Sequence, residues 1–201
     1  MNKLGNGIYA TGVLSLATGH YEDALSVREA ELSMLRRLGA GELNILLTQS
    51  NLASTYDALG RHQDAMRMSR DVYFGRLKLL GQEHRESLIA ALNYASSLVQ
   101  TERFEEARSL LREYMPVARR ILGAGHDHTL RMRTIYASTF SLDANATLDD
   151  LREAKTTFEE TRRTAQRLLG GAHPIVAAID IELEVARAAL RTRETPSPGV
   201  A

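Results

Sequence analysis

Three histidines, His84, His126 and His173, each stand three residues after a glycine that follows a leucine. Imidazole is a common metal ligand, and Asp127 and His128 add a carboxylate and a second imidazole beside His126. A metal site has no reason to be copied at every turn, however, and no further cluster of ligands stands at a suitable spacing. We therefore interpret these histidines as turn residues and expect no metal.

Other catalytic patterns are also missing from the sequence. It contains no nucleophile elbow, no phosphate-binding loop and no zinc-protease helix motif. The adjacent acids Glu105-Glu106, Asp149-Asp150 and Glu159-Glu160 would point about 100° apart on a helix, so they suit solvated faces better than paired catalytic acids. We expect a protein that is not an enzyme and has no cofactor.

The elements that carry these residues repeat. Moving forward by 42 residues superimposes several positions of the stretch 46–87 on the stretch that follows it. Self-similarity at this period is typical of a solenoid, in which each unit buries its apolar face against a neighbour. The matched pairs include Asn51 and Asn93, Ala53 and Ala95, Ser54 and Ser96, Ala65 and Ala107, Gly81 and Gly123, and His84 and His126.

The pattern predicts one array over 1–193, followed by a disordered tail over 194–201. Its repeats are 5–40, 43–82, 85–124 and 127–171, with a capping helix over 174–193. Each second helix should end at a Leu-Gly pair, because glycine can adopt the left-handed conformation that closes a helix. The expected helix pairs are 6–17 with 21–38, 43–58 with 62–80, 86–100 with 104–122, and 127–142 with 148–169.

The end of the array departs from the pattern. Between Gly123 and Gly170 the period stretches to 47 residues, which predicts an enlarged turn over 141–150. Thr147 has the spacing of a capping box with Asp150. Glu184 lies 47 residues after Ala137, at a position where a further repeat would bury an alanine. We therefore interpret the last helix as a cap and not as a fifth repeat.

The residues of the repeat also carry a family resemblance. Leu52-Ala53, Tyr56, Gly60 and Ala65 resemble the tetratricopeptide consensus. The longer period, closed by Leu-Gly-x-x-His, is similar to the 42-residue repeats of kinesin light chains and covers about residues 5–175. The resemblance implies an all-α fold, a right-handed α-solenoid of stacked antiparallel helix pairs that forms a tetratricopeptide-like superhelix.

The resemblance further implies a binding surface. In that family the first helices of successive repeats line a concave groove that holds extended peptides. Asn51 and Asn93 could each donate to and accept from a peptide main chain, so we expect them to be the anchors. The alternative is that these polar side chains only keep a helix face solvated. The groove residues implied here are Ser50, Asn51, Ser54, Asp57, Leu92, Asn93, Ser96, Gln100, Arg131, Thr134 and Ser138.

Charge restricts the partner. The chain has 25 basic and 25 acidic residues, so no overall field favours nucleic acid or an anionic membrane. The acidic peptides and terminal carboxylates that members of the family take up need cations on the first helices. The helices expected over 43–58 and 86–100 contain no Lys or Arg. The first helix of the fourth repeat contributes only Arg131 and Arg133. We expect a protein or peptide partner with a neutral or mixed-charge segment.

Location and assembly give the remaining expectations. The absence of cysteine agrees with a reducing compartment, and the weakly apolar N-terminus fits a repeat better than a signal peptide, so we expect a cytoplasmic protein. The alternative function is self-association. The first helix would expose Ile8, Val13 and Leu14, and this N-terminal edge could stack on another copy, or the chain could be a piece of a longer array.

Overall fold

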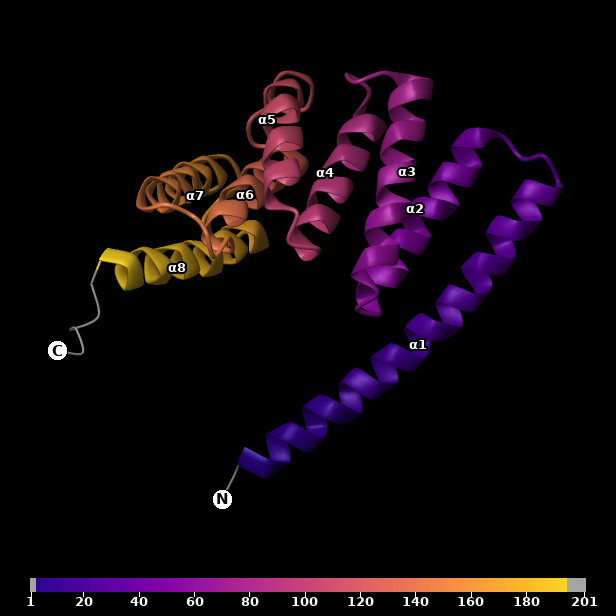
Figure 1. The fold of residues 1–201 in the computed structure, drawn as a ribbon, viewed down its shortest axis with the longest axis horizontal. Helices are drawn as coiled ribbons and strands as arrows, with labels where there is room; N and C mark the ends of the chain where they lie inside the picture. The colour runs from indigo at the N-terminus through magenta and orange to yellow at the C-terminus, as the bar shows by residue number, and fades with distance from the viewer. Residues whose placement is uncertain (1–2, 195–201) are drawn as a thin grey trace. The chain divides into compact units, whose positions relative to one another are not determined.

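The computed structural model describes residues 3–194, with side chains from residue 20 onward, and within these residues it contains helices and no strands (Figure 1). The chain divides into two compact units at residues 79 and 80, which are described separately. The first unit contains α1 (Lys3–Arg37), α2 (Glu42–Ala58) and most of α3 (His62–Leu80). The second contains α4 (Arg85–Gln100), α5 (Phe104–Ile121), α6 (Asp127–Ser141), α7 (Leu148–Leu169) and α8 (Pro174–Glu194).

The prediction of a helix pair in the first repeat was wrong. A single helix, α1, runs from Lys3 to Arg37 and passes through Gly19, where the sequence suggested a turn. Glycine permits a left-handed turn but does not force one, and a helix tolerates it at a cost of roughly 1 kcal/mol. The side chains of residues 1–19, including Ile8, Val13 and Leu14, lie outside the described residues.

The predicted helix ends at Leu-Gly pairs are confirmed. The glycine at each of these ends has a positive φ, which is the conformation that a side chain disfavours and that glycine adopts freely. In the first unit Gly39 has φ 65°, and in the second Gly123 has φ 99° and Gly170 has φ 87°. These turns set the lengths of the helices and hence the register of the residues on them.

The turn inside the third repeat differs from its counterpart in the second. In the second repeat Gly60 has φ 72°, and the Arg61 N–H donates to the Tyr56 carbonyl at 2.8 Å. Forty-two residues on, Glu102 adopts φ 59°, and the next N–H makes the equivalent 2.8 Å bond to the carbonyl of Leu98. A non-glycine residue in this conformation costs about 1–2 kcal/mol, so the turn is imposed by the packing of α4 and α5.

Small residues lie where helices cross. Ala95 on α4, Ala107 on α5 and Ala137 on α6 are each 0% exposed, as the resemblance implies. In the first unit, a Cβ added to Gly75 of α3 would lie 2.6 Å from a methyl carbon of Leu46 on α2.

The enlarged turn is confirmed, and the last helix begins at Pro174 as expected. Residues 142–147 separate α6 from α7, and Ala146 in this turn packs against Leu151 and Leu190. The Thr147 hydroxyl accepts a hydrogen bond from the Asp150 N–H at 3.2 Å, and the Asp150 carboxylate accepts from the Thr147 N–H at 2.8 Å, which completes the capping box.

Candidate functional site

The recurring histidines are helix caps. His84, His126 and His173 precede α4, α6 and α8, and the ring Nδ1 of each accepts a hydrogen bond from the backbone N–H two residues later. The three N–Nδ1 distances are 3.1, 3.2 and 3.3 Å. The side chain thus satisfies an N–H that the first turn of a helix leaves without a partner. The sequence indicated that these histidines belong to the turn, but not that the ring itself is the cap.

His128 has a different environment. Its Nδ1 atom is buried without a hydrogen-bond partner, and it lies 3.7 Å from a carboxylate oxygen of Asp127. Burial, followed by repulsion from His126, lowers the pKa of His128. Within the described residues, no group of three or more His, Cys, Asp or Glu residues is placed to hold a metal ion.

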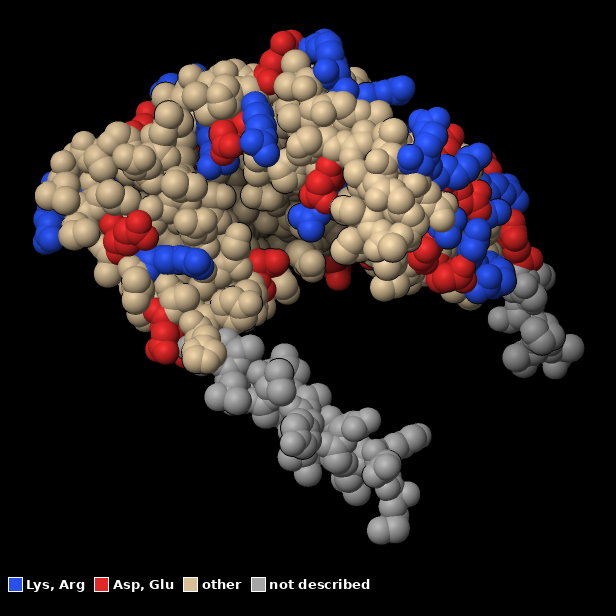
Figure 2. All heavy atoms as spheres, turned by 180° about the vertical axis from the view of Figure 1, so that it is seen from behind, with Lys and Arg blue, Asp and Glu red and all other residues tan. Residues whose placement is uncertain are grey.

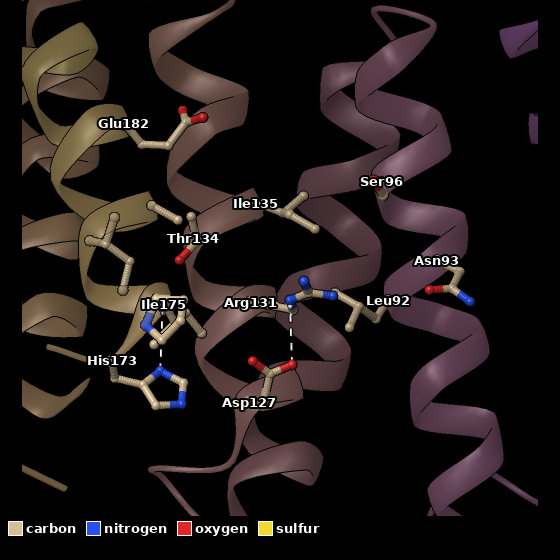
Figure 3. Close-up of a pocket in the computed structure, with 13 residues that line it drawn as sticks. Leu92, Asn93, Ser96, Asp127, Arg131, Thr134, Ile135, His173, Ile175 and Glu182 are labelled. Atoms are coloured by element: carbon tan, nitrogen blue, oxygen red, sulfur yellow. Dashed lines mark hydrogen bonds and ion pairs between the residues drawn. The ribbon is translucent and has the colours of Figure 1, made fainter. Parts of the chain in front are cut away.

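A groove of about 520 Å³ lies on the second unit where α4, α6 and α8 come together (Figure 3). These are the first helices of the third and fourth repeats and the last helix of the chain. The groove is open to solvent on one side and reaches the core on the other. It is lined by Leu92, Asn93 and Ser96 of α4, by Asp127, Arg131, Thr134 and Ile135 of α6, and by His173, Pro174, Ile175, Ala178, Ile179 and Glu182 at α8.

The floor of the groove is apolar. Leu92, Ile175 and Ile179 are buried, whereas Ile135 is only partly covered and projects between α4 and α8. Thr134 lies beside it, and its hydroxyl donates to the carbonyl of Leu130 at 3.0 Å. The floor can therefore accept an apolar side chain of a ligand, whose burial is favourable by about 25 cal/mol per Å² of apolar surface.

The charged side chains of the groove differ in how free they are to bind a ligand. The Arg131 guanidinium lies 3.4 Å from the Asp127 carboxylate one helical turn earlier, so the two charges largely offset each other. Glu182 on α8 accepts a hydrogen bond from the Ser138 hydroxyl at 3.2 Å. Among residues 20–194, no cation forms an ion pair with Glu182.

Outside the groove the charges alternate in sign. On the face shown in Figure 2, basic and acidic side chains lie interspersed over the C-terminal part of the second unit. On α8, Arg187 contacts Glu184 at 2.8 Å and Glu159 of α7 at 3.1 Å. Paired surface charges of this kind contribute little stability and no strong field, so they do not suggest an anionic partner.

Five of the predicted groove residues line this one groove: Leu92, Asn93, Ser96, Arg131 and Thr134. Gln100 is exposed at the end of α4 and is not part of the lining. Ser138 is 8% exposed because α8 covers it, so it supports Glu182 and is not itself open to a ligand. Arg133 points to Glu160 of α7, at 2.9 Å, and leaves Arg131 as the one arginine in the lining.

The four predicted residues of the first unit lie on α2. Asn51, Ser54 and Asp57 are exposed, and Ser50 is partly exposed. The Ser54 hydroxyl donates to the carbonyl of Ser50 at 3.3 Å, and the Asp57 carboxylate lies 2.8 Å from a ring nitrogen of His62. The Asn51 side chain therefore remains the most available polar group of this face.

The contribution of α8 was missed from the sequence. The last helix was interpreted as a cap because Glu184 replaces a buried alanine, and Glu184 is indeed exposed. Ile175, Ala178 and Glu182 on another face of that helix form a wall of the groove. The sequence contained a signal for this contribution. Asn93, Ile135 and Glu182 are separated by the repeat intervals of 42 and 47 residues, so they occupy the same register position.

Comparison with known proteins agrees with this architecture. Residues 45–86 and 88–128 match the model of the tetratricopeptide repeat family. No curated protein matches the chain in sequence. Across the described part of the chain, no helix combines the length and the apolar character that a bilayer crossing requires.

Solved structures share the fold. One crystal structure of a kinesin light chain-like protein of Podosopora anserina, which has nearly identical TPR-like repeats, matches with a TM-score of 0.73 and 22% identity over 91% of this chain and 85% of that one. A second structure of such a protein from the same organism matches with a TM-score of 0.70 and 21% identity over 96% and 91%. BtubC (BKLC) from P. vanneervenii matches with a TM-score of 0.65 and 17% identity over 91% and 79%. Residues 45–128 therefore carry tetratricopeptide repeats, and the described part of the chain has the all-helical fold of these kinesin light chain-like repeat structures.

Proposed function

We propose that the chain is an interaction scaffold that binds an extended segment of a protein partner along the first helices of its repeats. Tetratricopeptide repeats generally mediate protein–protein interaction, and the family is generally non-catalytic. The observation that carries the proposal is the groove of α4, α6 and α8, which contains Leu92, Asn93 and Ser96 together with Arg131 and Thr134. The repeat register alone predicts that these five residues share one surface.

The chemistry of the lining suits a main chain. The Asn93 side chain is exposed and lines the groove from α4 (Figure 3). An amide can donate one hydrogen bond and accept another, which is the pattern that an extended peptide offers along one edge. Ser96, one turn later, is partly exposed on the same face. On α2 of the first unit, Asn51 occupies the same register position and is exposed.

Crosslinking tests whether the partner occupies this groove. A photoreactive phenylalanine analogue placed at Ser96 should capture a segment of the bound protein, because Ser96 lines the groove. The matched control carries the same analogue at Ser109, an exposed serine of α5 that is not part of the lining. We expect crosslinks from position 96 that are missing from position 109, both read by mass spectrometry. Equal capture at the two positions would contradict the proposal.

Self-association is a second candidate, favoured by exposed apolar side chains on α1 and α8. On α8, Ile181 is 67% exposed and Val185 is 42% exposed, and within the described residues no helix follows to cover them. On α1, Val27 is 68% exposed and Met34 is 48% exposed. The register of Ala24 gives α1 the pattern of a second helix, whereas α8 has that of a first helix. A second copy could therefore complete the missing pair.

A further inference from the structure

One row of the groove changes its chemistry from helix to helix. Asn93 on α4, Ile135 on α6 and Glu182 on α8 occupy the same position in successive repeats, at intervals of 42 and 47 residues. All three line the groove. A peptide that crosses the helices would therefore meet an amide, then an apolar side chain, then a carboxylate.

The middle of the row forms an apolar subsite. Ile135 is partly exposed, and Leu92 of α4 and Ile179 of α8 are buried beneath the groove on either side of it. Ala178 lines the wall of α8 with a small side chain, which leaves room above the floor. A Leu, Ile, Val or Met side chain of a ligand would lose its contact with water here.

The end of the row is an uncompensated negative charge. The Glu182 carboxylate is held by the Ser138 hydroxyl at 3.2 Å, and the one arginine of the lining, Arg131, is engaged with Asp127 at 3.4 Å. Glu182 is only partly exposed, so its charge is less screened than that of a free surface residue. A carboxylate fixed in this way is complementary to a lysine or arginine of the ligand.

The spacing of the two subsites follows from helix packing. Neighbouring packed helices lie about 8–10 Å apart, and an extended chain advances about 3.3 Å per residue. Ile135 and Glu182 lie on the neighbouring helices α6 and α8. Side chains of one peptide that reach both positions are therefore separated by roughly three residues.

We infer that the partner segment carries an apolar residue and a lysine or arginine about three positions away, bound at Ile135 and at Glu182 respectively. This inference rests on the proposed function of the groove and adds the chemistry of its ligand. It selects a basic and apolar segment over an acidic one.

Selection from a random peptide library displayed on phage tests the inference with the full chain as bait. The wild type should enrich peptides that combine an apolar residue with Lys or Arg at about the inferred spacing, in either chain direction. Glu182→Lys should reverse the charge preference towards Asp and Glu. Glu184→Gln is the matched control, because that exposed acid of α8 is not part of the lining and should leave the preference unchanged.

Affinities of the enriched peptides give a second measurement. Glu182→Gln should weaken a selected basic peptide about three- to tenfold, as expected for a partly exposed charge-assisted bond, and added salt should reduce this difference. Circular dichroism confirms that each variant is folded. Enriched peptides with no basic preference, or with the same preference in Glu182→Lys, would overturn the inference, and crosslinking of such a peptide from position 96 would show whether the groove is still the binding site. A failure to enrich any peptide would overturn both the inference and the proposed function.

Discussion

The Ser138 hydroxyl on α6 and the Glu182 carboxylate on α8 are joined by a hydrogen bond of 3.2 Å. The same hydroxyl also lies 3.1 Å from the carbonyl of Thr134 one turn earlier, so its single proton is shared between the two acceptors, and the contact with Glu182 places that carboxylate over α6. The last helix is therefore more than a cover for the core. It completes the groove and gives it a negative end.

The small residues at helix crossings predict a stability effect. Ala95→Arg should destabilise the fold strongly, because Ala95 is 0% exposed, overpacking costs about 1–3 kcal/mol, and a buried unpaired charge costs more. Asn93→Arg, two residues away on the same helix but exposed, is the control and should change stability little. Chemical denaturation of the two variants measures the difference. Equal stability of Ala95→Arg and the wild type would show that Ala95 does not lie at a helix crossing.

The cap made by His126 predicts a second effect. His126→Ala should cost about 0.5–2 kcal/mol, the usual range for losing a side-chain cap, and His126→Asn should recover part of the loss. Zinc or a chelator should not change the melting temperature of the wild type, because a metal that binds the folded chain would raise it. A saturable rise with zinc that disappears in His126→Ala would show a metal site.

His128 predicts a dependence of stability on pH. Because burial lowers its pKa below the ordinary value of 6.5, the unfolded chain binds the proton more tightly than the folded chain. The free energy of unfolding should be highest above pH 6.5 and should fall as the pH falls through 6.5 towards the lowered pKa. Denaturation at a series of pH values should show a smaller slope for His128→Leu than for His20→Gln, a change at an exposed histidine. Equal slopes would contradict the lowered pKa of His128 as the cause of the pH dependence.

Much of the fold could be predicted because the ends of the helices are marked by local sequence signals. Gly123 and Gly170 are required by backbone geometry, and a shared register transfers each boundary to the next repeat. The first repeat was predicted wrongly for the same reason, because Gly19 has the right spacing but glycine alone does not end a helix. Its turn would have depended on packing, which a local pattern does not contain.

The groove was predicted in part. The register predicted that Asn93 and Thr134 share one surface, and both line the groove, since residues on one helix face follow from the period. It did not reveal that Arg133 turns to Glu160 or that α8 covers Ser138, because both depend on which neighbouring helix is within reach. The contribution of Glu182 was missed because only Glu184 of the last helix was compared with the repeat register.

The exposed end faces predict how the purified chain behaves in solution. If self-association occurs through them, the mass measured by light scattering should rise with concentration up to tens of micromolar. Ile181→Asp should abolish that rise, because it places a charge on the exposed apolar face of α8. Leu142→Asp, a change at another exposed apolar residue, is the control. A monomer of constant mass over this range would contradict self-association.

The central claim is that the Asn93 amide in the groove of α4, α6 and α8 holds a peptide main chain. Calorimetry of the wild type and of Asn93→Ala, against a peptide selected on the wild type, tests it most directly. Asn93 is exposed, so the variant should keep its melting temperature. Binding should weaken by about 1–3 kcal/mol, because the amide would lose up to two hydrogen bonds worth about 0.5–1.5 kcal/mol apiece. Full affinity in the folded variant would contradict the claim and place the binding surface elsewhere on the chain.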